Sequence, residues 1–142
     1  MNIGIDARPA MKSKTGVGNY VLHLATHLNR LDPENQYHLF SSSYKDRFQM
    51  SAVDGLTRFV VHDYKIPNRV MDFLWNRVGG LPLKFLFKGM NVFHYTGNIS
   101  LPLGSIPTVA TLYDLYHIKY PQAVEPRYRI PVDELKKKTG RG

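Results

Sequence analysis

Two closely spaced glycines near the start of the chain could help to bind an anion. They lie in Thr15–Tyr20 (TGVGNY), which follows a short apolar run and opens a stretch with helical spacing. Free N–H groups at the start of a helix attract anions, and glycine lets a ligand approach the backbone. The third glycine of a dinucleotide-binding motif and the Gly-Lys-Ser/Thr of a Walker loop are both absent. The spacing fits a turn with a helix cap equally well.

Two further positions combine suitable chemistry with a suitable place. His94 lies near the carboxyl end of a predicted strand, where it could bind a sugar hydroxyl or a phosphate. A histidine in such a place is more often structural. Tyr113 and Asp114 follow the last predicted strand, and this carboxylate could hold a sugar hydroxyl or a positively charged partner. Asp is also a favoured N-cap residue, and we rank that capping role slightly higher.

Several other kinds of site are excluded by the residues present. The chain has no cysteine, so it can form no disulfide, thiolate metal site or cysteine nucleophile. His23 and His27 are four residues apart, but no third ligand and no His-Glu-x-x-His pattern accompany them. A Gly-x-Ser-x-Gly hydrolase elbow is absent as well. We therefore expect no metal and no cofactor.

The segments that must position these residues alternate between strand and helix patterns. Apolar β-rich runs predict strands at Asn2–Ala7, Tyr37–Phe40, Thr57–Val61, Asn91–Tyr95 and Ile106–Leu112. Three- and four-residue spacing predicts helices over Val17–Leu31 and, more briefly, Met71–Val78. Such alternation is typical of α/β proteins, so we predict a Rossmann-like parallel sheet with helices on both faces. Ligands of such sheets bind at the carboxyl ends of the strands.

Composition sets broader limits. The chain has 142 residues, 43% of them hydrophobic and 21% charged, which is typical of a soluble globular domain. Apolar stretches are shorter than the roughly 20 residues that span a bilayer, and the first residues do not fit a secretory signal. The net charge of +8 favours anionic partners such as phosphates or lipid headgroups. Aromatic and basic residues do not interleave in a nucleic-acid-binding pattern, so we expect no nucleic acid as a partner.

Taken in order, several motifs resemble one known family. They are Met1–Pro9, Lys14–Tyr20, Asn91–Asn98, Leu101-Pro102, Pro107–Leu115 and Tyr120-Pro121. This ordered set is similar to the N-terminal half of retaining GT-B glycosyltransferases, a group that includes bacterial mannosyltransferases. The resemblance covers about residues 1–125. We expect residues 1–124 to form a Rossmann-like domain and residues 125–142 a basic tail, disordered or truncated.

The resemblance implies a function and a set of contacts. Such enzymes move a sugar from a nucleotide-sugar to a glycan or lipid acceptor, without a metal, between two Rossmann-like domains. By resemblance, Gly16, Val17 and Gly18 approach the donor diphosphate, while Asn19, Tyr20 and His94 contact the acceptor or the sugar. Many members act on membrane lipid or polysaccharide acceptors, so we expect this chain in the cytoplasm, where it could lie at the inner face of the membrane. Contact with anionic lipid would account for part of the positive charge.

The chain also departs from the family pattern. The family carries His-Asp beside the reacting sugar where this chain has Tyr113-Asp114, so the resemblance makes these two the candidate catalytic residues. Tyr113 can donate a hydrogen bond but cannot hold a positive charge. A complete enzyme needs a second domain of similar size, so we expect this half to be inactive alone. The alternative is a non-catalytic binding or assembly module that forms a homodimer through the exposed cleft face.

Overall fold

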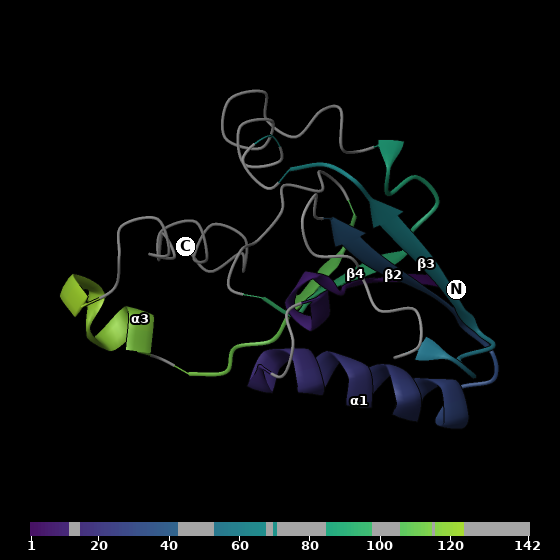
Figure 1. Ribbon diagram of the computed structural model, residues 1–142, viewed down its shortest axis with the longest axis horizontal. Helices are drawn as coiled ribbons and strands as arrows, with labels where there is room; N and C mark the ends of the chain where they lie inside the picture. The colour runs from purple at the N-terminus through teal and green to yellow at the C-terminus, as the bar shows by residue number, and fades with distance from the viewer. Residues whose placement is uncertain are drawn as a thin grey trace. The chain divides into compact units, whose positions relative to one another are not determined.

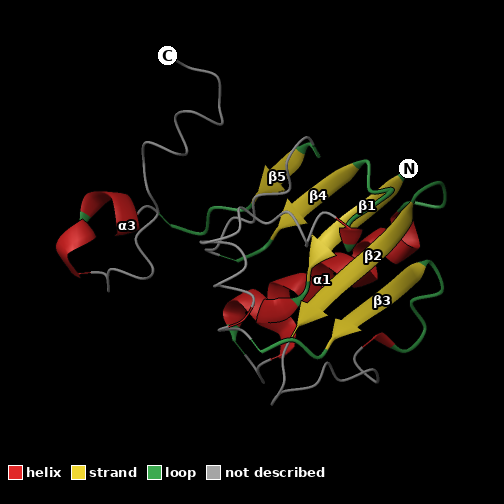
Figure 2. Ribbon diagram, turned by 90° about the horizontal axis from the view of Figure 1, so that it is seen from above, coloured by secondary structure: helices red, strands yellow, loops and turns green. Residues whose placement is uncertain are grey.

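A parallel five-stranded sheet organises the first part of the chain. The computed structural model describes residues 1–11, 15–42, 53–67, 70, 85–97, 106–114 and 116–123. The strands are β1 (Asn2–Asp6), β2 (Gln36–Ser42), β3 (Phe59–Tyr64), β4 (Val92–Tyr95) and β5 (Thr108–Ala110). They lie in the order β3-β2-β1-β4-β5, with every neighbouring pair parallel (Figure 2). This arrangement confirms the predicted α/β, Rossmann-like fold class.

The strand order reverses at β1, which lies in the middle of the sheet. From β1 the chain moves outward to β2 and then β3, and afterwards returns to the other side of β1 as β4 and then β5. Ile3 of β1 is paired with Tyr37 of β2 and with Val92 of β4. A reversal of this kind is a topological switch point, and ligands of open α/β sheets bind outside the carboxyl ends of the strands there. The ends of β1 and β4 are therefore the expected place for a ligand.

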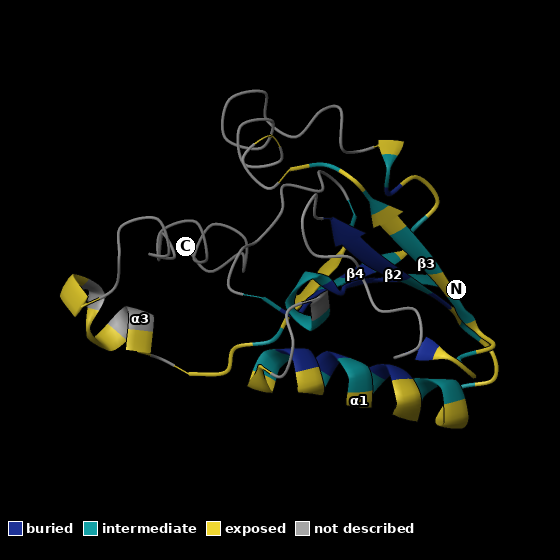
Figure 3. Cartoon of the chain, viewed as in Figure 1, coloured by how far each residue is buried: buried dark blue, intermediate teal, exposed yellow. Residues whose placement is uncertain are grey.

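Helix α1 (Gly16–Leu31) covers one face of the sheet (Figure 1). Val21 and Ala25 are buried toward the strands while the opposite side of the helix is exposed, as Figure 3 shows. Val21 packs with Ile5 and Leu39 in an aliphatic core cluster. The helix ends at Asp32, whose N–H still donates to the carbonyl of Leu28. Its amphipathic pattern fixes this packing, because the apolar residues recur at helical spacing.

The opposite face of the sheet carries an aromatic core cluster. Its buried members are Phe40, Phe87, Phe93 and Tyr95. Gly4 of β1 lies beneath this cluster, where a Cβ would collide with the Phe93 ring and lie 3.3 Å from the Phe40 ring. The glycine is therefore required by the close approach of the rings to the β1 backbone.

The observed elements agree with most predicted ones and differ at two strands. The third strand was predicted at Thr57–Val61 but runs from Phe59 to Tyr64, because Thr57 and Arg58 belong to the preceding turn. The fifth was predicted over Ile106–Leu112 but spans only Thr108–Ala110, and all three of its residues are exposed. The helix predicted over Met71–Val78 lies outside the described residues.

The described chain divides into two compact units, Met1–Ala110 and Thr111–Gly142. In the second unit, the short helix α3 (Tyr116–Lys119) is followed by the 3-10 turn η4 (Pro121–Ala123). The predicted tail of residues 125–142 lies outside the described residues. Within the described part of the chain, no helix has the length and apolar character needed to cross a bilayer.

Candidate functional site at the switch point

A buried ion pair lies directly at the carboxyl end of β1. Asp6, the last residue of the strand, is only 2% exposed. Arg8 donates to its two carboxylate oxygens from Nε at 2.8 Å and from Nη2 at 2.7 Å, and its backbone N–H donates at 3.1 Å. A buried carboxylate is costly unless it is paired, and this bidentate geometry supplies the partner. The pair fixes the guanidinium of Arg8, whose side chain is 21% exposed, at the switch point.

The end of β4 is joined to the same place. The hydroxyl of the buried Thr96 donates to the backbone carbonyl of Asp6. Gly97 follows, and a Cβ on it would lie 3.6 Å from Pro9 Cγ and 3.8 Å from Asp6 Oδ2. The segment after β4 thus lies against the segment after β1. Two stretches that are about ninety residues apart in the sequence form one surface.

The first turn of α1 packs against the 3-10 turn η1 (Arg8–Met11). A Cβ on Gly18 would lie 2.9 Å from the carbonyl oxygen of Pro9 and 3.3 Å from Ala10 Cα. Thr15 caps the helix, because its Oγ1 accepts from the N–H of Gly18 at 3.0 Å. Gly18 is therefore a packing residue, and the helix-cap interpretation of the segment is confirmed.

Gly16 and Val17 have different surroundings from Gly18. They are the first two residues of α1, so their N–H groups have no partner inside the helix. None of the described residues accepts a hydrogen bond from either group. A Cβ on Gly16 would have no atom within 4 Å. This end of the helix combines open space with two N–H donors, which an anion could occupy.

Tyr20 and His94 meet on the α1 face of the sheet. Their rings are edge to face with centroids 6.4 Å apart. Burial lowers the pKa of His94, and the nearby Asp6 carboxylate offsets only part of that effect. His94 is therefore neutral near pH 7, so its imidazole is suited to hydrogen bonding rather than to holding a positive charge.

Of the remaining sequence-predicted residues, one lies on α1 and two lie in the second unit. Asn19 lies in the first turn of α1 with an exposed side chain, and its N–H donates to the carbonyl of Thr15. Tyr113 and Asp114 are exposed and belong to the second unit. There Asp114 Oδ1 accepts from the N–H of Tyr116 at 2.9 Å, at the start of α3. This bond matches the capping role that the sequence slightly favoured.

Sequence reasoning missed the Asp6–Arg8 pair and its link to Thr96. The signal was present, because an aspartate ends a buried strand and an arginine follows two residues later. A carboxylate in that position needs a cation or several donors. The sequence cannot show that Thr96 meets Asp6, because that contact depends on β4 pairing with β1.

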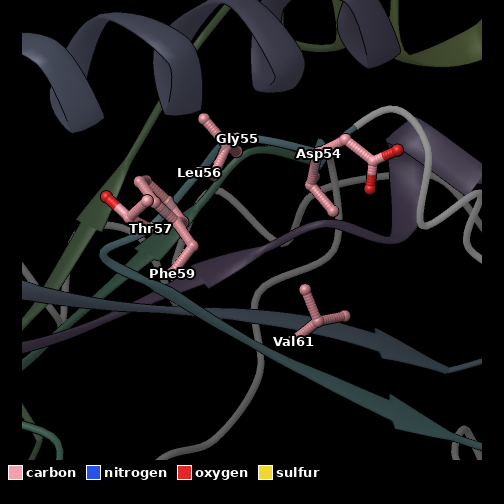
Figure 4. A pocket seen from close by; sticks show the side chains of 7 residues that line it. Asp54, Gly55, Leu56, Thr57, Phe59 and Val61 are labelled. Atoms are coloured by element: carbon pink, nitrogen blue, oxygen red, sulfur yellow. The ribbon is translucent and has the colours of Figure 1, made fainter.

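A separate pocket lies away from this surface, on the α1 face of the sheet beside β3. It has a volume of about 300 Å³ and lies among Asp54, Leu56, Phe59 and Val61, as Figure 4 shows. Phe59 and Val61 belong to β3, while Asp54 and Leu56 belong to the turn before it. The pocket contains none of the residues at the switch point.

Within the described parts of the chain, no three His, Asp or Glu side chains gather in a way that could hold a metal ion. Comparisons with protein-family models, curated proteins and solved structures found no match to this chain.

Proposed function

We propose that this chain is the N-terminal, acceptor-side half of a retaining GT-B glycosyltransferase. One observation carries the proposal: three stretches that bear the family resemblance meet at one surface. They are Asp6–Pro9, Thr15–Gly18 and His94–Gly97, joined by the contacts of Thr96 with Asp6 and of Gly18 with Pro9. The meeting place is the switch point, where an open α/β sheet binds its ligands.

The chemistry of this surface suits the diphosphate of a nucleotide-sugar. The N–H groups of Gly16 and Val17 and the dipole of α1 favour negative charge at this edge of the sheet. Preorganised donors of this kind stabilise the charge of a departing phosphate without a metal. Neutral His94 and Tyr20 would lie on the sugar or acceptor side.

Binding to the first turn of α1 can be tested directly. Titration with UDP and with GDP, followed by amide NMR, should shift the Gly16 and Val17 signals at about millimolar ligand. A Gly16→Val variant should weaken binding about tenfold, equivalent to losing one hydrogen bond to a charged group. Thr26→Val, an exposed change further along α1, is the matched control and should leave binding unchanged. Equal binding by Gly16→Val and wild type would contradict the proposed anion site.

The need for two domains in sugar transfer gives a second test. The 142 residues alone should transfer no sugar from UDP- or GDP-hexoses to glycan or lipid acceptors, because transfer in such enzymes needs residues of both domains. Radiolabelled donor makes slow transfer measurable. Transfer by the chain alone would contradict its role as one half of the enzyme.

An assembly role is the second candidate, and a run of exposed apolar side chains favours it. In the second unit, large hydrophobic residues that are 40% exposed or more follow one another along the chain at Leu112, Tyr113, Tyr116 and Tyr120. Exposed apolar surface of this kind often marks a contact with another chain. Light scattering should then reveal a homodimer, whereas a monomer at high concentration would remove this candidate.

A further inference from the structure

Two histidines face each other across β2 and β3 on the aromatic side of the sheet. Nδ1 of His38 lies 3.0 Å from Nε2 of His62, so the two rings share one hydrogen bond. The His62 ring also stacks on Phe40, with centroids 4.6 Å apart and planes within 8°. The other nitrogen of His38, Nε2, is buried and has no hydrogen-bond partner in the part of the chain that the structure describes.

Counting protons shows why this arrangement favours neutral rings. Two neutral imidazoles carry two protons on four nitrogens, and one proton lies between the facing nitrogens. With three protons on the pair, one lies between the facing nitrogens and one is on Nε2 of His38, so the charged pair holds a buried N–H without an acceptor whichever ring donates. A fourth proton would place two N–H groups head-on across 3.0 Å. Each added proton therefore works against the closed arrangement.

The surrounding groups do not compensate a positive charge. On this face the described neighbours of the pair are Phe40, Val60 and Tyr64, and burial raises the pKa of Tyr64, so that it stays neutral. Asp63 points to the opposite face, where it accepts from the hydroxyl of Ser41 at 2.8 Å. Lys65, which directly follows β3, is exposed. No described carboxylate lies beside the two imidazoles.

We propose that the His38–His62 pair is a proton-sensitive latch that holds β3 to the sheet when both rings are neutral and releases it in mild acid. β3 is the edge strand and pairs with β2 alone among the described strands, so the release falls on this one strand pair. The latch is independent of the proposed glycosyltransferase function.

The direction of the pH effect follows from proton linkage. Burial lowers the pKa of both histidines below the ordinary value of 6.5. The opened strand pair therefore binds protons more tightly than the closed one. The latch is closed above about pH 6.5 and weakens as the pH falls. Between pH 7.5 and 5.5, each histidine can raise the opening equilibrium constant at most about tenfold, and the pair about 100-fold.

Amide hydrogen exchange of the full chain measures this opening strand by strand. Amides of β3 should exchange up to about 100-fold faster at pH 5.5 than at pH 7.5, after correction for intrinsic rates, while β1 amides change much less. With His62→Gln the effect should fall to about tenfold at most, and with both histidines replaced by Gln it should vanish. His94 is present in every variant, so its own titration cancels in the comparison.

A surface histidine supplies the matched control. His23→Gln changes an exposed residue of α1 and should keep the full pH effect on β3. If the variants at the pair do not fold, the ring signals of wild-type His38 and His62 still decide, because they must titrate below pH 6.5. Unchanged β3 protection at pH 5.5, equal pH effects in wild type and the double variant, or ring titration at or above pH 6.5 would overturn the proposal.

Discussion

The two ends of the sheet both join distant segments through polar groups, but the groups at the amino end are exposed and bond to one another. There the terminal amine of Met1 donates to Asn35 Oδ1 at 2.7 Å. Asn2 and Asn91 bond reciprocally, because the N–H of Asn2 donates to Asn91 Oδ1 and the N–H of Asn91 donates to the carbonyl of Asn2. These groups are exposed, and each bond closes a turn or aligns a strand start.

At the carboxyl end, the polar groups are partly buried and some donors are left over. Asp6 is paired with Arg8, and Thr96 binds the backbone of Asp6. Gly16 and Val17 nevertheless keep N–H groups that no described residue uses. A concentration of polar residues is therefore no sufficient sign of a ligand site. The more informative feature is an arrangement that holds unpaired donors rigidly next to open space.

Removing the carboxylate of Asp6 should have the largest effect on stability. Asp6→Ala removes the carboxylate that both Nε and Nη2 of the partly buried Arg8 bind, and we expect the free energy of unfolding to fall by about 3 kcal/mol. Asn91→Ala, its counterpart at the amino end, removes one exposed hydrogen bond, from the N–H of Asn2, and should cost about 1 kcal/mol. Urea unfolding followed by circular dichroism measures both. Equal losses would show that the two ends do not differ in this way.

Two glycines of the first α1 turn should respond differently to the same substitution. Gly18→Ala places a methyl group 2.9 Å from the carbonyl of Pro9, and we expect a loss of about 2 kcal/mol. Gly16→Ala meets open space and should change stability by less than about 0.5 kcal/mol. The unfolding midpoints of the two variants decide the matter. A similar loss at both positions would contradict the distinction between a packing glycine and an open one.

How far the sequence predicts this fold depends on the pattern of each element. The spans of β1, α1 and β4 follow from apolar runs and helical spacing, because their packing faces are continuous in the sequence. The end of β3 does not, since His62-Asp63-Tyr64 places polar side chains on both faces of an edge strand. In the sequence, a run of polar residues on an edge strand has the same pattern as a loop, and only its pairing with the neighbouring strand distinguishes the two.

The candidate site was predictable in its parts but not as a whole. The glycines at 16 and 18 were identical as sequence signals, yet only Gly18 is held by packing. Their difference depends on where Pro9 lies, and that follows from the register of β1 in the sheet. The Asp6–Arg8 pair likewise matters because Asp6 is buried, and the sequence alone does not show which residues are buried.

The smallest expected effect concerns the turn from Asp32 to Tyr37, at the amino end of the sheet. Hydrogen bonds donated by Asn35 and by the hydroxyl of Tyr37 hold the pKa of Asp32 well below its usual range. Burial and the bond to Asp32 raise the pKa of Tyr37 to about 12. Tyr37→Phe keeps the ring that stacks on Phe59, so the change removes only the hydroxyl.

The pKa of Asp32 should then move up toward its usual value near 3.9, as carbon NMR of the carboxyl group can measure. Because the folded-state pKa of Asp32 is depressed, its stabilising effect is present above about pH 4 and is lost as the pH falls through the folded-state value. The difference in urea midpoint between wild type and Tyr37→Phe should therefore be larger at pH 7 than in strong acid. An unchanged Asp32 titration would mean that Asn35 and the N–H of Glu34 hold the Asp32 carboxylate without help from the Tyr37 hydroxyl.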